Sequence, residues 1–110
     1  MEIEFEVVKG YTEIKLIGRL DTVSSQVLDR TLTNIINKGN ENLFINFKEL
    51  TYINSSGLRV FLTAAKRLGT NGKKLSLCEM QPYIKEVFDI AGFTYLFNFC
   101  ATRTEVIANL

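Results

Sequence analysis

The chain has 110 residues, of which 46% are apolar and 23% charged, and this length suits one domain, residues 1–110, around a single core. The formal net charge of +1 and the scattered basic residues argue against nucleic-acid binding, which usually needs a basic patch. The absence of histidine removes the usual base for a serine nucleophile and the commonest metal ligand, so neither a catalytic nor a metal site is expected.

The N-terminal residues predict an antiparallel hairpin. Ile3, Phe5 and Val7 alternate with glutamates, which is typical of a strand with one apolar face and one wet face. Gly10 turns the chain, and the same alternation resumes over residues 12–17. Facing glutamates and lysines of the two strands suit cross-strand pairing on the solvent side.

A helix is predicted next, and either Asp21 or Thr22 can cap its start. Gly39 is expected to stop it. The apolar stripe that defines this helix consists of Val23, Val27, Leu28, Leu32, Ile35 and Ile36.

The rest of the chain alternates between strands and helices. The predicted elements are a strand at 43–47, a helix ending near Leu68, a strand at 74–78, a helix opened by Pro82 and closed by Gly92, a strand at 95–97 and a short helix from Thr104. The helix after the proline is expected to pack through Tyr83, Ile84, Val87, Phe88 and Ile90. This alternation argues for parallel strands joined by crossovers. The predicted fold class is therefore α/β: a mixed sheet, made of the antiparallel hairpin plus parallel strands, packed with about four helices.

Two hydroxyl groups stand where the third predicted strand gives way to its helix, in the run Asn54-Ser55-Ser56-Gly57. Sites in such sheets form at the carboxyl ends of the parallel strands, and this run lies at one of them. Asp21 lies at another, if its strand is adjacent. On the simplest interpretation the polar side chains are ordinary helix caps, and the glycine allows a close approach of the helix to the sheet.

Two chemical interpretations compete with a simple cap. A nucleophilic serine would need a base, and neither histidine nor a Gly-x-Ser-x-Gly pattern is present. A covalent phosphate needs no such partner, because the free N–H groups and the positive dipole end of a helix start favour it. It would add about −1.5 to −2 charges, enough to reverse the sign of the net charge. The residues alone leave the cap and the phosphate open.

Three segments occur in an order that carries a resemblance. They are the run from Ile53 to Leu58, the segment Gly18-Arg19-Leu20-Asp21, and the late helical segment 85–93. Together they resemble the STAS domain family, whose type members are bacterial anti-sigma-factor antagonists. The first matches the family signature between strand and helix, the second its Gly-x-Leu-Asp, and the third its late helix. The resemblance covers nearly the whole chain.

The resemblance implies a switch without enzymatic activity or a cofactor. The unphosphorylated antagonist binds an anti-sigma factor that is also a serine kinase, the sigma factor is released, and phosphorylation reverses the binding until a phosphatase removes the mark. Carried onto this chain, the acceptor is Ser55. The implied contact surface consists of Asp21, Asn54, Ser56, Gly57 and Arg59. The family usually has aspartate where this chain has Asn54, which keeps the capping oxygen and loses the charge.

Asn54 also supports an alternative within the same family: an accessory or scaffold subunit of a transporter or signalling assembly that is never phosphorylated. Cys78 and Cys100 form no CxxC pair, and we interpret them as free thiols of a reducing cytosol. The sequence shows no leader and no apolar run of membrane-spanning length, so a cytoplasmic protein is expected.

Overall fold

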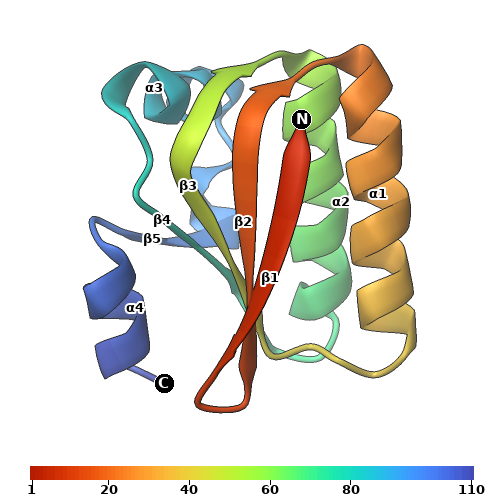
Figure 1. Cartoon of the computed structure of the whole chain (residues 1–110), viewed down its shortest axis with the longest axis vertical. Helices are drawn as coiled ribbons and strands as arrows, with labels where there is room; N and C mark the ends of the chain where they lie inside the picture. The colour runs from red at the N-terminus through yellow and green to blue at the C-terminus, as the bar shows by residue number, and fades with distance from the viewer.

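The protein is built on one five-stranded sheet, seen in the computed structural model, which describes all 110 residues (Figure 1). The elements in chain order are β1 (Glu2–Val8), β2 (Tyr11–Leu20), α1 (Thr22–Asn37), β3 (Leu43–Ile53), α2 (Ser55–Gly69), β4 (Leu75–Cys78), α3 (Pro82–Ala91), a 3-10 turn (Thr94–Leu96), β5 (Phe97–Cys100) and α4 (Arg103–Ala108). The strands lie in the order β1-β2-β3-β4-β5; β1 is antiparallel to β2, and every other pair is parallel. The predicted α/β class, with its mixed sheet and four helices, is confirmed.

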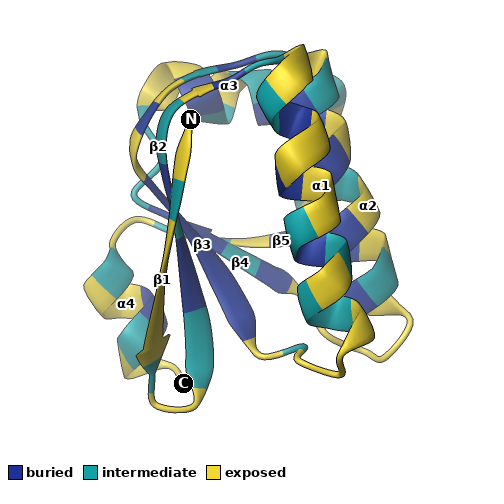
Figure 2. Ribbon diagram, turned by 45° about the vertical axis from the view of Figure 1, so that its right-hand side comes forward, coloured by how far each residue is buried: buried dark blue, intermediate teal, exposed yellow.

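The sheet has two unequal faces. Helices α1 and α2 lie side by side on one face, and α4 lies on the other (Figures 1 and 2). Strand β3 shows the alternation that causes this: Leu43, Ile45 and Phe47 join the large core under α1, α2 and α3, whereas Phe44 joins a small cluster beneath α4. Most of the apolar burial is therefore on the helix-covered face.

Phenylalanine rings tie α2, α3 and the far edge of the sheet together. The ring of Phe88 in α3 lies 6.0 Å from those of Phe47 and Phe61, and 5.4 Å from that of Phe97 at the start of β5. These centroid distances and the tilted or edge-on geometries are the ones that aromatic pairs prefer. The cluster fixes α3 against the sheet, near the end of β3, where Tyr83 donates to the carbonyl oxygen of Thr51.

The largest differences from the predicted strand boundaries lie in β2, β3 and β5. Strand β2 continues to Leu20 rather than ending at residue 17. Strand β3 continues to Ile53 rather than ending at residue 47, because its second half pairs with the second half of β2. The last strand was predicted at 95–97, but residues 94–96 form a 3-10 turn, and pairing with β4 starts only at Phe97. Local composition did not reveal these boundaries, since pairing with a neighbouring strand decides each of them.

Several predicted core positions are exposed. In α1, Val23 and Val27 are 74% and 46% exposed; in α3, Tyr83 and Ile90 are 48% and 79% exposed. The expectation that they belong to the buried stripes was wrong. Each helix contacts the molecule over a narrow strip: α1 lies against α2 and β2 and fully buries only Ser25, Leu28 and Leu32. The outer apolar side chains are left in solvent.

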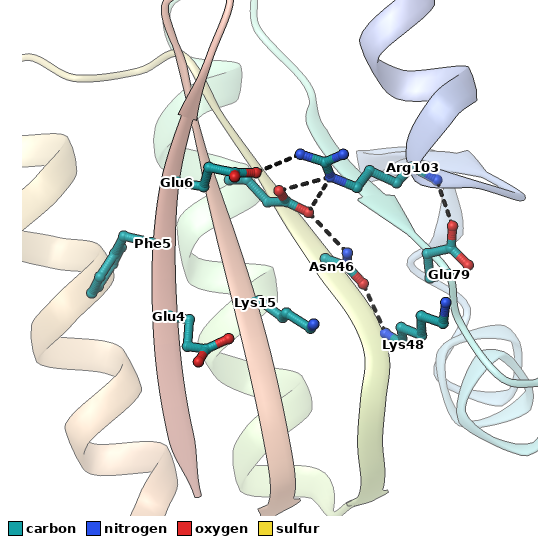
Figure 3. A pocket seen from close by; sticks show the side chains of 9 residues that line it. Glu4, Phe5, Glu6, Lys15, Asn46, Lys48, Glu79 and Arg103 are labelled. Atoms are coloured by element: carbon teal, nitrogen blue, oxygen red, sulfur yellow. Dashed lines mark hydrogen bonds and ion pairs between the residues drawn. The ribbon is translucent and has the colours of Figure 1, made fainter.

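The face that α4 covers holds a buried ion pair that joins both ends of the chain (Figure 3). Glu13 in β2 is only 4% exposed, and its two carboxylate oxygens accept hydrogen bonds of 2.8 and 2.9 Å from Nε of Arg103. Asn46 in β3 donates a further bond of 2.8 Å to the same carboxylate. A second guanidinium nitrogen of Arg103 lies 2.5 Å from Glu6. These bonds raise the pKa of Arg103, chiefly through Glu13, and hold the short helix α4 on the sheet.

Removing the guanidinium should leave a buried carboxylate without a charge partner. Because Arg103 is itself partly exposed, water can reach the site, and we expect Arg103→Ala to lower the free energy of unfolding by about 1–3 kcal/mol. Urea denaturation followed by circular dichroism measures this. The double variant Arg103→Ala/Glu13→Gln should recover part of the loss, since it removes the orphaned charge. A double variant less stable than Arg103→Ala would contradict the assignment.

Both cysteines are free, as expected, with Cys78 buried and Cys100 half-buried. Burial raises the pKa of the Cys78 thiol to about 12, so it stays protonated and behaves as an apolar core group. No helix combines the length and the apolar composition that crossing a bilayer requires.

Candidate functional site

The two turns that the sequence singled out lie next to each other. Leu20, the last residue of β2, pairs with Ile53, the last residue of β3, in parallel register. Asp21 and Asn54 are the next residues, so helices α1 and α2 both begin at the same end of the sheet, where β2 and β3 end (Figure 1). The backbone N–H of Asn54 donates to the carbonyl oxygen of Leu20 over 3.3 Å. The adjacency on which the prediction for Asp21 depended is confirmed.

Asn54 caps helix α2 and bridges to α1. Its backbone is extended, with φ −114° and ψ −176°, and its Oδ1 accepts a 3.1 Å hydrogen bond from the N–H of Gly57. Its Nδ2 donates to Oγ1 of Thr22, 3.2 Å away on the other helix start. The Ser56 hydroxyl lies 3.5 Å from the same Thr22 oxygen. The amide side chain of Asn54 thus caps α2 and also connects α2 to α1.

Ser55 is left out of this network. It is the first residue of α2, its side chain is exposed, and none of the bonds at the two helix starts uses its hydroxyl. The capping role that the sequence also allowed for the serines therefore belongs to Asn54 alone. Ser55 presents a free hydroxyl at the positive end of the helix dipole.

Asp21 is held by a reciprocal cap. Its Oδ1 accepts from the N–H of Ser24 over 3.0 Å, and the Ser24 hydroxyl accepts from the N–H of Asp21 over 2.9 Å. The backbone and side-chain hydrogen bonds from Ser24 lower the pKa of Asp21, so this carboxyl is ionised at neutral pH. The site carries one fixed negative charge at its α1 side.

Gly57 allows α2 to start this close to the sheet. A Cβ at this position would lie 2.7 Å from Cγ of Leu20 and 3.0 Å from Cγ1 of Ile53, well inside van der Waals contact. Both neighbours are buried core residues that end the two paired strands. The glycine is therefore needed for space, as the sequence suggested.

Two arginines frame the site. Arg59 is exposed on α2, four residues after Ser55 and hence one turn along the same side of the helix. The guanidinium of Arg19 lies 4.0 Å from the ring centroid of Tyr52 on the neighbouring strand.

The sequence indicated Arg59 but missed the bridging role of Thr22 and the cap from Ser24. The spacing Asp-x-x-Ser was the available signal for that cap.

The arrangement is typical of a regulatory binding surface and not of an active site. It offers an exposed, unbonded serine at a helix start, with no histidine in the chain to activate it. A surface of this kind can bind a partner and can be modified, but it lacks the parts of a nucleophilic active site.

Comparison with known proteins gives the family. The STAS domain model matches residues 2–106. BtrV of Bordetella bronchiseptica, described as a candidate anti-sigma factor antagonist, is 32% identical over 98% of this chain and 93% of its own. The anti-sigma-B factor antagonist of Staphylococcus aureus is 28% identical over 89% of this chain and 91% of its own. The phosphorylated form of SpoIIAA, a Bacillus cell fate determinant, superposes with a TM-score of 0.77 at 24% identity over 98% of both chains.

The chain therefore belongs to the STAS domain family. Within it, the two curated relatives are named as anti-sigma factor antagonists, one of them as a candidate, and such antagonists are regulatory proteins rather than enzymes. The family, fold and non-enzymatic class that the sequence predicted are confirmed.

The close approach at Gly57 makes a stability prediction. Alanine normally stabilises a helix relative to glycine, but here its Cβ would overlap the side chain of Leu20, and we expect Gly57→Ala to cost about 1–3 kcal/mol. Gly69, at the other end of α2, has open space where a Cβ would lie, with no neighbouring atom within 4 Å, so Gly69→Ala should be neutral or slightly stabilising. Urea denaturation of both variants measures the change in the free energy of unfolding. Equal effects would show that Gly57 has no packing role.

Proposed function

We propose that this protein is an anti-sigma factor antagonist that is switched by phosphorylation of Ser55. The observation that carries the proposal is the free, exposed hydroxyl of Ser55 at the start of α2, in a turn whose side-chain cap is supplied by Asn54. A kinase can add a phosphate there without breaking any hydrogen bond that holds the helix.

The local electrostatics suit a phosphate on this residue. The N–H groups of the first turn of α2 and the positive end of its dipole stabilise an added anion. Arg59, one turn along, supplies a positive charge on the same side. Phosphorylation would therefore leave the fold intact and change the surface.

That surface is the proposed partner-binding site. It consists of Asp21, Asn54, Ser56, Gly57 and Arg59, around Ser55. Its α1 side is already negative through the ionised carboxylate of Asp21. A phosphate would add about −1.5 to −2 charges beside it, turning a surface of balanced charge into a strongly acidic one. A partner that fits the unmodified surface would then meet repulsion and unpaired charge.

The partner we propose is an anti-sigma factor with serine kinase activity, and a phosphatase would restore the unmodified form. Support comes from the relatives: two curated ones carry the name anti-sigma or anti-sigma-B factor antagonist, and SpoIIAA has been solved in both its unphosphorylated and its phosphorylated form. We further propose that residues 1–110 form a single STAS domain, since the family model spans nearly all of them.

Incubation with the cognate kinase and ATP, followed by mass spectrometry, tests the acceptor. We expect one phosphate on Ser55 in the wild type, none in Ser55→Ala, and the phosphate still on Ser55 in Ser56→Ala. A kinase that labels a control antagonist but leaves Ser55 unlabelled would instead favour the accessory or scaffold role, which Asn54 in place of the usual aspartate supports.

Binding to the anti-sigma factor should respond to charge at this position. We expect Ser55→Ala to bind about as well as the wild type, and Ser55→Asp to bind at least tenfold more weakly, because a fixed negative charge mimics part of the phosphate. Isothermal titration calorimetry measures both. Thr63→Asp, two turns further along α2 and also exposed, is the matched control and should bind normally. Equal loss in both aspartate variants would point to general charge rather than to this site.

A further inference from the structure

Strand β1 forms an open edge of the sheet. It is the first strand in the sheet order, and its backbone pairs with β2 alone, from Glu2 opposite Ile17 to Val8 opposite Tyr11. No other backbone hydrogen bond of the chain reaches it. One side of a seven-residue strand thus presents unpaired N–H and C=O groups, which can receive another strand.

The two faces of β1 differ in chemistry. Glu2, Glu4 and Glu6 alternate with apolar residues and share the face that carries Arg103. Only Glu6 is paired there, through Arg103; neither Glu2 nor Glu4 forms an ion pair. Glu4 lies opposite Lys15 of β2, but the Lys15 ammonium forms its ion pair with Glu49. The edge therefore carries carboxylates at alternate positions, and those of Glu2 and Glu4 have no ion-pair partner.

The apolar face is uncovered beyond Ile3, which packs against the edge of the main core. Phe5 and Val7 are 54% and 76% exposed, although the alternation predicted that this face would be buried. Figure 2 shows β1 at the border of the sheet, apart from α1, with exposed residues along its length. An added strand would place its own apolar side chains beside these two and bury them in part.

A second copy of this chain does not fit the edge. An antiparallel β1–β1 pair centred on Glu4 would place that residue opposite itself and Glu2 opposite Glu6, so like charges would meet at every position of one face. A shift by one residue would set glutamates against apolar side chains and lose the common face. The charges therefore disfavour self-pairing.

We propose that the edge of β1 binds an extended segment of a partner protein in which basic residues alternate with apolar ones, adding a sixth strand to the sheet. Main-chain hydrogen bonds would supply the pairing. Lysines or arginines of the segment would lie beside Glu2 and Glu4, and its apolar residues beside Phe5 and Val7. The competing explanation is that the glutamates only protect the edge from aggregation. The proposal does not depend on phosphorylation of Ser55.

A peptide titration separates these explanations. The probe has seven residues, with lysine at the odd positions and valine at the even ones; its counterparts carry glutamate in place of lysine, or N-methylated peptide bonds that cannot pair. By NMR, we expect the basic peptide to shift the amide signals of residues 2–8 and to slow their hydrogen exchange, and neither counterpart to do so. No effect at millimolar basic peptide, or an equal effect of either counterpart, would overturn the proposal and leave a protected edge only.

A charge-swap variant adds the specificity test. Glu2→Lys/Glu4→Lys should weaken binding of the basic peptide about tenfold and permit binding of the acidic one, at roughly two- to fivefold per cross-strand charge pair. Asp29→Lys/Glu86→Lys makes the same change in net charge at exposed positions of α1 and α3 and should bind as the wild type does. Equal weakening in the two variants would show attraction to overall charge and overturn the proposal.

Discussion

The parallel pairing of β2 with β3 is the constraint on which the functional surface depends. Its register ends both strands at the same level, with Leu20 opposite Ile53, so two helices begin side by side. The residue that caps α2 then also connects the two helices, because Asn54 donates a hydrogen bond to Thr22 of α1. Without that register, Asp21 and the serine turn would be separate helix starts rather than one site.

Gly57 makes this arrangement sterically possible. A side chain at that position would collide with the last core residues of both strands, so the helix start could not lie as near the sheet edge. Glycine is a poor helix residue, and its presence in the first turn of α2 lowers intrinsic helix propensity. The apolar side of α2, which buries seven residues, offsets that loss through packing. At this position, the space needed for the close approach of helix and sheet outweighs helix propensity in determining the residue.

The two faces of the sheet are held to their helices by different interactions. One holds nearly all apolar burial beneath three helices, and on the other a small apolar cluster and the Glu13–Arg103 pair keep α4 in place. The proposed switch lies at the end of the sheet and the proposed strand-binding edge along β1, so both are outside the main core. A phosphate or a bound strand can therefore change the surface while the packed interior stays as it is.

The sequence by itself determined the order of elements, the mixed sheet and the turn that bears Ser55, because alternation, helical spacing and glycine positions are local signals. It also indicated that Gly57 is there for space. Only the tertiary structure decided that Asn54, not a serine, caps α2, and that Val23 and Phe5 lie in solvent. Those outcomes depend on which strand or helix is adjacent, and an apolar pattern cannot report how far a neighbouring element extends. The ion pair between Glu13 and Arg103 joins residues 90 positions apart, so no local pattern could have revealed it.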